Sequence, residues 1–383
     1  IIAMLQARIG RLDAGPRRAL SAASIYGPQA QRSALLALLG ARPSDTSIDL
    51  DLSALVQAEL IELQPVRPLL SGSAAPAIDD RVYSFRSPLL RQAAYELLSV
   101  NALLVGHRLA ARFLERSGSA DPLRLAEHFQ QGREPEKAGQ YFLRAAVQRA
   151  RESMPNGADA LFDQANQQLA GLPDGPAKQR LLIDILLYRV RFGLRSSRQE
   201  ENLACLDEAQ TLLLGIEDVG EHDISDELRR AWVEQLIGRI CLLEGRIAES
   251  MLYCRRVLPV AEAMDDAPLL ATASQFLSLA LIMQGRFLEA QLHLSRTRSL
   301  LSYLDHDLQR ISTQSVAALC QMVQGDCLAG LAAHDALITQ LIDKGQHALA
   351  GLPEVLHVVA LALSGDIDAT QRHAQQVLPQ AEQ

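Results

Sequence analysis

The chain has 383 residues, of which 48% are hydrophobic and only 4% aromatic, so it can bury a large aliphatic core and extensive disorder is disfavoured. Its net charge of −8 argues against a globally basic nucleic-acid-binding protein. The charge is uneven: residues 1–150 hold 18 basic and 14 acidic side chains and residues 151–383 hold 19 and 31, so the second part favours basic or neutral partners.

The cysteines and the ends of the sequence bear on compartment. None of the cysteines forms a C-x-x-C pair, which predicts a reduced, cytoplasmic environment. No apolar run approaches the roughly 20 residues of a membrane helix, and no basic leader opens the chain. Because position 1 is Ile, we expect the sequence to be a piece of a longer polypeptide. The cysteines are Cys205, Cys241, Cys254, Cys320 and Cys327.

The first region, residues 1–104, predicts a small winged-helix domain. Its predicted helices cover residues 5–12, 17–25, 29–39 and 52–63, the last capped by Asp51. A stretch rich in Pro and Gly follows, and residues 81–86 alternate as a strand does. Ser87-Pro88 then opens another helix with Pro at its first position.

The second region, residues 105–220, predicts degenerate helical hairpins. Leu125–Phe129 and Ala138–Ala150 form a predicted helix pair joined by the turn at residues 132–135. Residues 154–193 and 195–214 are expected to hold further hairpins out of strict phase.

The third region, residues 221–383, contains a repeat. Gly245, Gly285, Gly325 and Gly365 are spaced 40 residues apart, each between two helical stretches. Five residues after each comes a small or short side chain, at Ser250, Ala290, Gly330 and Thr370. The glycine permits a positive φ where the first helix ends, and the small residue lets two helices approach. A fixed period of this length predicts an all-α solenoid of helical hairpins.

These repeats resemble the tetratricopeptide family in its longer form of about 40 residues. The family's Gly-x-aromatic-x-x-Ala turn is present as Gly285-Arg286-Phe287-Leu288-Glu289-Ala290, whereas the other copies have Ile or Cys in place of the aromatic residue. Repeats of this kind occur in the sensor domain of the bacterial maltose regulator and its relatives.

The front of the chain has a second resemblance. Residues 7–13, 19–27 and 55–61 look like the winged helix behind a signalling ATPase of the STAND type, and residues 83–95 are similar to that family's junction, with Ser87 where the family usually has His. The resemblance implies a phosphate-loop ATPase upstream, which would bind ATP, and allows an oligomer formed through that ATPase.

The sequence lacks the motifs of the common catalytic sites. It has no G-x-x-x-x-G-K-[ST] loop, H-E-x-x-H motif, zinc-type Cys/His spacing or G-x-S-x-G elbow, so we expect neither catalysis nor a cofactor in this chain. Asp305-His306-Asp307 and Glu221-His222-Asp223 fit helix capping better than metal binding. His107 and His128 are predicted packing or surface residues, and Cys241 and Cys254 core residues.

Binding to DNA is disfavoured by the predicted recognition helix. Residues 53–63 contain Glu59 and Glu62 but no Arg or Lys, whereas contacts to phosphates and bases favour basic or amide side chains. The basic residues lie on the preceding helices instead, at Arg8, Arg11, Arg17 and Arg18.

The repeats therefore carry the predicted function. Stacked hairpins form a groove lined by their first helices, which suits a protein, a peptide or a small effector. Trp232, the only tryptophan, is either a groove anchor or a core residue. The other groove positions predicted by register are Gln235, Arg239, Gln275, Leu279, Ser315 and Leu319.

We interpret the chain as the regulatory and sensor region of a bacterial signal-transduction ATPase, in which the repeats bind the effector and the winged helix relays the change. Two alternatives stay open. The parent could be a multidomain adenylate or guanylate cyclase or a kinase with its catalytic domain elsewhere. It could also be a LuxR-type transcriptional regulator.

Overall fold

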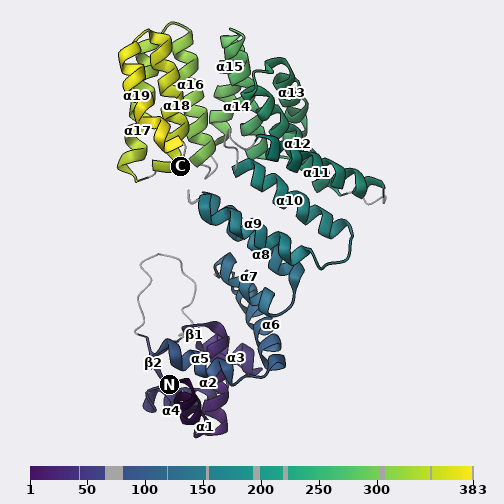
Figure 1. Ribbon diagram of the computed structural model, residues 1–383, viewed down its shortest axis with the longest axis vertical. Helices are drawn as coiled ribbons and strands as arrows, with labels where there is room; N and C mark the ends of the chain where they lie inside the picture. Colours follow the sequence, from purple (N-terminus) through teal and green to yellow (C-terminus); the bar gives the residue numbers. More distant parts are fainter. Residues whose placement is uncertain are drawn as a thin grey trace. The chain divides into compact units, whose positions relative to one another are not determined.

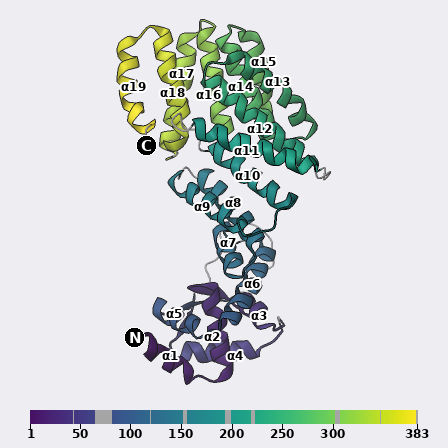
Figure 2. The ribbon, with the colours of Figure 1, turned by 45° about the vertical axis from the view of Figure 1, so that its right-hand side comes forward.

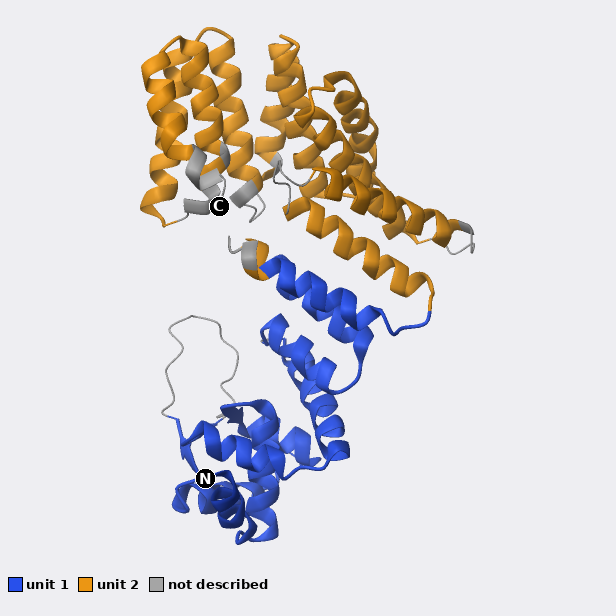
Figure 3. Ribbon diagram, viewed as in Figure 1, with its two compact units in different colours: residues 1–148, 158–173 blue, residues 149–157, 174–383 orange. Residues whose placement is uncertain are grey.

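The structure is a computed structural model that describes residues 1–42, 44–64, 81–118, 120–151, 155–192, 199–218, 223–301, 307–345 and 347–381. Within these residues the chain is almost entirely helical, with α1 to α19 and three short strands, so the all-α class is confirmed. The chain divides into two compact units (Figure 3). Unit 1 contains residues 1–148 and 158–173, and unit 2 contains residues 149–157 and 174–383. The three-part division of the sequence stays a prediction.

Unit 1 combines helices with a small sheet. The strand β3 (Val82–Phe85) lies in the middle, antiparallel to β1 (Gln29–Gln31) and β2 (Ile61–Leu63). Tyr83 is opposite Ala30 on one side and Leu63 on the other. The helices of this part are α1 (Ile2–Gly10), α2 (Ala14–Tyr26), α3 (Arg32–Leu39), α4 (Ser47–Gln57), α5 (Pro88–Glu96), α6 (Val100–Ser117), α7 (Pro122–Gln131), α8 (Pro135–Arg151) and α9 (Pro155–Leu169).

Two predicted helices in this part have wrong bounds: the one predicted at 29–39 begins later, and the one predicted at 52–63 both begins and ends earlier. Residues 29–31 form β1 because Gly27, with φ 111°, and Pro28 interrupt the helix before it, and the backbone then pairs with β3. Residues 61–63 form β2 because α4 ends at Gln57 and Glu59 takes a positive φ of 56°. Asp51 lies inside α4, whose N-cap is Thr46. The predicted strand at 81–86 and the helix opened by Pro88 are confirmed.

Unit 2 is a stack of antiparallel hairpins (Figures 1 and 2). The first helices of the hairpins are α10 (Pro176–Phe192), α12 (Ile224–Leu243), α14 (Ala267–Met283), α16 (Asp307–Val323) and α18 (His347–Ser364). The second helices are α11 (Gln199–Asp218), α13 (Ile247–Ala263), α15 (Phe287–Leu301), α17 (Cys327–Asp343) and α19 (Ile367–Ala381).

The turns repeat as the sequence predicts. All four phased glycines have a positive φ, between 73° and 106°, where the first helix ends. Ser250 and Ala290 are 0% exposed at the helix crossings. At Gly330 a Cβ would overlap Met322 and lie 2.7 Å from the carbonyl oxygen of Ala318, so only glycine fits this crossing. The 40-residue repeat of helical hairpins is thereby confirmed.

Consecutive first helices contact one another along the whole stack, whereas contacts between consecutive second helices are sparse or absent among the described residues. The first helices therefore form the inner, tighter row of the stack. Aliphatic cores lie between the hairpins: α10, α11 and α12 share one, and α12 to α16 share another. The side chains that the first helices leave partly exposed form what we call the first-helix face.

No single described helix is both long and apolar enough to cross a membrane. The pair α5 and α6 meets the length and composition criteria only when the two helices are taken together, and they are bent by 118°.

Candidate functional site

The predicted groove residues divide into two groups by exposure. Trp232 and Arg239 on α12 and Leu279 on α14 are partly exposed on the first-helix face. The other four are packed inside the stack, because their positions on the helix point toward neighbouring helices. Their exposed fractions are 0% for Gln235, 7% for Gln275, 0% for Ser315 and 5% for Leu319. A binding role for any of the seven stays a prediction.

Gln235 and Ser315 have identifiable partners in the interior. The Gln235 amide faces the thiol of Cys254 on α13, although no hydrogen bond of normal geometry to its amide atoms is found in the described part of the chain. The Ser315 hydroxyl donates to the carbonyl oxygen of Ile311 at 3.1 Å, and its own carbonyl lies 3.0 Å from Nε2 of His334. Both residues therefore act in packing between helices.

Two arginines on the first-helix face lie against aromatic rings. The guanidinium carbon of Arg191, on α10, is 4.0 Å from the ring centroid of Trp232 and 5.9 Å from that of Tyr188. The guanidinium carbon of Arg239, on α12, is 5.3 Å from the ring centroid of Phe276 on α14. We call these five residues the arginine–aromatic cluster. It spans three consecutive first helices.

The surroundings of these two arginines disfavour their positive charge. Burial, together with the nearby charge of Arg191, lowers the pKa of Arg239 to about 10. Burial also lowers the pKa of Arg191. Both side chains are nevertheless partly reached by solvent. The two guanidinium groups are therefore largely enclosed by protein but not fully removed from water.

Neither arginine of the cluster has an acidic partner among the described residues: no ion pair or hydrogen bond of either guanidinium is found there. The helix α14 has no charged residue at all. The only acidic side chain of α12 beyond Trp232 and before Glu244 is Glu234, which pairs with Arg256 of α13 at 2.7 Å. Asp266 is close enough to raise the Arg191 pKa slightly, but its carboxylate accepts a hydrogen bond from the backbone N–H of Leu269 at the start of α14.

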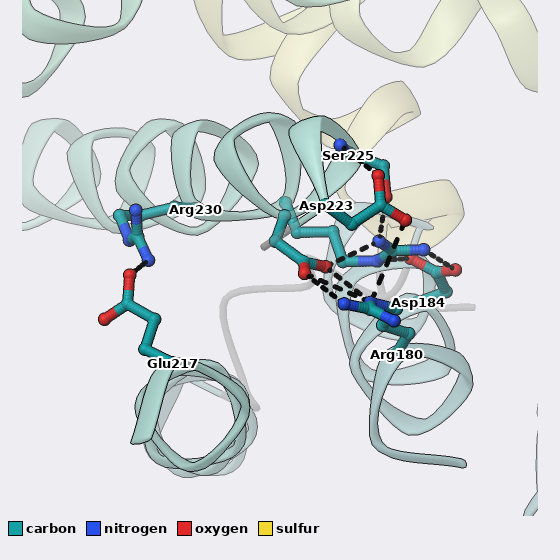
Figure 4. Close-up of polar contacts among 8 residues, drawn as sticks. Arg180, Asp184, Glu217, Asp223, Ser225 and Arg230 are labelled. Atoms are coloured by element: carbon teal, nitrogen blue, oxygen red, sulfur yellow. Dashed lines mark hydrogen bonds and ion pairs between the residues drawn. The ribbon is translucent and has the colours of Figure 1, made fainter. Parts of the chain in front are cut away.

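The opposite end of α10 and α12 also carries two arginines, and there both are paired with aspartate carboxylates (Figure 4). Arg180 donates to both carboxylate oxygens of Asp226, at 2.9–3.1 Å. Arg229 donates to both oxygens of Asp184, at 2.8 and 2.9 Å, and to Asp226 at 2.9 Å. We call these four residues the paired cluster. Burial alone would lower the pKa of Arg229, but its hydrogen bond with Asp184 and the charges of Asp184 and Asp226 raise it above its ordinary value.

Unit 1 contains a buried pair of histidines. His107 on α6 and His128 on α7 are 7% and 5% exposed, with their Nδ1 atoms 2.9 Å apart, and the Tyr95 hydroxyl is 2.8 Å from Nε2 of His107. When both rings are neutral, Tyr95 donates to His107, which donates to His128. Burial lowers the pKa of His107 to about 4 and that of His128 to about 3. Both are packing residues, as expected.

A cavity of about 530 Å³ opens on unit 1, between α1, α2, α3 and the stretch from Leu97 through α6. Its lining is mixed, with aliphatic side chains beside polar and basic ones. Residues that line it include Arg17, Arg18, Leu38, Leu97, Val105 and Leu109.

Other candidate ligand groups do not form a site. His334, His357 and His373 lie ring to ring, with centroids 5.9 and 4.9 Å apart, yet among the described residues no group of His, Cys, Asp and Glu could hold a metal ion. Cys241 and Cys254 are buried, as predicted. Asp223 caps α12 by accepting from the Ser225 backbone N–H at 2.9 Å. Glu221, His222, Asp305 and His306 lie outside the described residues, and so does the side chain of Asp307.

Sequence reasoning identified Trp232 and Arg239 and missed Tyr188, Arg191 and Phe276. A usable signal existed: α14 has an aromatic residue and no charged residue, and the preceding first helix, α12, has an arginine near its end. The out-of-phase hairpin that contains α10 concealed the contribution of Tyr188 and Arg191.

No family model matches the chain, and no curated protein matches it. Among solved structures, it is similar to a Pyrococcus horikoshii signal transduction ATPase with numerous domains that has a tetratricopeptide repeat sensor, with 11% identity and a TM-score of 0.41 over 100% of this chain and 65% of that one. A Rap protein complexed with competence and sporulation factor gives 12% identity and a TM-score of 0.48, covering 99% and 96%. Aspartyl phosphate phosphatase F from Bacillus subtilis gives 14% and 0.46, covering 76% and 78%. The fold assignment here rests on the hairpins themselves.

Proposed function

We propose that this chain is a non-catalytic regulatory region that binds a protein or peptide partner on its first-helix face. The observation that carries the proposal is the arginine–aromatic cluster, where three consecutive first helices expose aromatic rings and cations on one face. Partly exposed aromatic and arginine side chains are the residues that contribute most to protein interfaces. A small effector bound by the same face is the second form of this proposal.

We also propose that unit 1 contains a winged helix that relays the bound state to a signalling ATPase upstream. Two features support this. The elements run helix, strand, helix, helix, strand, strand from α2 to β3, with the sheet order β1-β3-β2. The chain itself lacks a phosphate loop, so ATP would be bound by a different part of the parent protein, in the cytoplasm. The repeats with a bound partner and the repeats without one would each favour a different packing of the winged helix.

The peptide-binding part is tested by selecting a random 12-residue peptide library, displayed on phage, against the full chain. We expect selected peptides to lose binding to a variant with Trp232→Ala and Phe276→Ala and to keep binding to a control with Arg230→Gln and Arg256→Gln. Each variant is first checked for an unchanged helical circular dichroism spectrum. Selected peptides that bind all three proteins equally would contradict a partner site on this face.

The ATPase context is tested by reading the native open reading frame through both ends of the chain. A G-x-x-x-x-G-K-[ST] motif upstream of residue 1 is the expected result. An upstream region without any nucleotide-binding domain would contradict the relay proposal and leave the peptide-binding proposal intact.

A further inference from the structure

The arginine–aromatic cluster presents cationic groups that form no ion pair with the described part of the chain. Arg191 and Arg239 lie close enough for one charge to lower the pKa of the other, and Arg151 lowers that of Arg191 further. The paired cluster shows that the same two helices can supply carboxylates to buried arginines. Among the described residues no carboxylate forms an ion pair with Arg191 or Arg239, so two largely enclosed guanidinium groups lack an acidic partner there, which is unfavourable in the free protein.

The aromatic rings hold these guanidinium groups in place while their N–H groups stay available. Trp232 stacks against Arg191 and Phe276 lies next to Arg239. A guanidinium over a ring face keeps its in-plane donors free for a planar bidentate acceptor, which a carboxylate is. Arg191 and Arg239, with the rings they contact, therefore combine two anion-binding groups with apolar contact area.

We propose that the occupant of the first-helix face is an acidic peptide segment, whose Asp or Glu side chains pair with Arg191 and Arg239 and whose apolar side chains pack on Trp232 and Phe276. This rests on the proposed function and gives the partner its chemistry. The segment supplies the carboxylates that the paired cluster receives from within the chain. It also reverses, at this site, the preference for basic or neutral partners expected from the overall acidity of residues 151–383.

The partial exclusion of water around Arg191 and Arg239 determines how strongly substitutions and salt should change the affinity for the peptide. Each charge-assisted hydrogen bond to a guanidinium is strong where water is partly excluded, so removing both arginines should weaken binding by about tenfold or more. Because the ion pairs are enclosed, raising the salt concentration should weaken binding less than it would for an exposed surface patch.

The test is the residue composition of the peptides selected on the full chain, followed by affinity measurements with four proteins. These are the wild type, Arg191→Met with Arg239→Met, Trp232→Ala with Phe276→Ala, and the control Arg230→Gln with Arg256→Gln. Peptides displayed as N-terminal fusions have no free C-terminus, so any carboxylate selected belongs to a side chain. Binding is measured by fluorescence polarisation with synthetic copies that are amidated at the C-terminus.

We expect the selected pool to be enriched in Asp and Glu, and its peptides to lose about tenfold or more in affinity to the double methionine variant and nothing to the control. A pool of neutral or basic peptides that depends on Trp232 and Phe276 but not on the arginines would overturn this inference and leave the proposed function standing. Peptides that ignore both cluster variants would overturn both. Methionine keeps the length and packing of each arginine stem, so the double variant is expected to fold.

Discussion

The two ends of the helix pair α10 and α12 hold arginines in opposite electrostatic states. At one end Arg180 and Arg229 form bidentate ion pairs with Asp226 and Asp184, and the paired side chains are only 11–29% exposed. At the other end Arg191 and Arg239 have aromatic rings and no acidic partner among the described residues. The helices and the residue type are alike, so the difference between the two ends lies in the carboxylates, which pair with the arginines at the first end only among the described residues.

This difference separates residues that stabilise the stack from residues available to a ligand. A pair of charges that is satisfied within the chain fixes the contact between two hairpins. An unsatisfied pair lowers stability, and functional sites are the places where proteins retain such groups. The paired cluster is therefore a structural lock between α10 and α12, and the arginine–aromatic cluster is the candidate site.

Breaking the paired cluster should give the largest effect. Asp226→Ala removes the carboxylate that binds both Arg180 and Arg229 and leaves two enclosed cations with reduced compensation. We expect the free energy of unfolding to fall by about 3 kcal/mol, as for other broken buried ion pairs. Urea denaturation followed by circular dichroism measures the change. A loss below about 1 kcal/mol would show that the paired cluster does not lock the hairpins.

The pH at which individual guanidinium groups lose a proton should also differ between the two clusters. The pKa of Arg239 is lowered to about 10, so it should lose its proton well before Arg229, whose pKa is raised. Because the folded-state pKa of Arg239 lies below its value in the unfolded chain, the unfolded state binds more protons between the two values, and the contribution of Arg239 to stability rises as the pH increases through this interval.

Carbon-13 NMR of the arginine Cζ atoms checks this, with the two signals assigned from Arg239→Lys and Arg229→Lys spectra. Equal titration of the two arginines up to pH 12 would contradict the difference in their surroundings.

Replacing the unpaired arginines should change the free energy of unfolding less than Asp226→Ala does, and in the opposite direction. In Arg191→Met with Arg239→Met, two uncompensated charges are exchanged for apolar side chains of similar length. We expect the free energy of unfolding to stay within about 1 kcal/mol of wild type or to rise. The lost cation–π contacts limit the gain. Urea denaturation is again the measurement, and a loss of more than about 2 kcal/mol would assign the cluster to structural stability instead of binding.

A solvent-exposed ion pair that involves another arginine of α12 provides a comparison for the enclosed ion pairs of the paired cluster. Arg230 pairs with Glu217 on α11, and both side chains are about two-fifths exposed. Arg230→Gln should cost no more than about 0.5 kcal/mol, because solvent screens the pair. A thermal melt that shows a cost as large as that of Asp226→Ala would mean that the enclosure of the paired cluster is not what makes it strong.

The repeat architecture was predictable because a 40-residue period depends on backbone geometry that few residues allow. Gly245 and Gly365 are needed for a positive φ, and Gly330 for a close helix crossing, and each leaves a mark in the sequence. The short strands β1 and β2 were not predictable from local patterns. Each has three residues, and pairing with β3, distant in sequence, makes them strands.

The candidate site was only partly predictable, because its residues come from three helices. Tertiary packing determines how these helices are aligned with one another, and local sequence does not show that alignment. Trp232 and Arg239 were accessible from the repeat, and Arg191 was not, because α10 lies outside the strict period. Gln235 illustrates the opposite case: it lies one turn from Trp232, but its side chain is fully buried against α13. The net charge of the region also concealed the local excess of positive charge.

The most direct measurement is quenching of the Trp232 fluorescence by iodide and by caesium. Trp232 is the only tryptophan, and the Arg191 guanidinium lies 4.0 Å from its ring, so its emission reports on the charge of the candidate site. We predict that iodide quenches more efficiently than caesium, although the chain has a net charge of −8, and that Arg191→Met with Arg239→Met removes the difference. Equal quenching, or a preference for caesium in the wild-type protein, would contradict an anion-binding first-helix face.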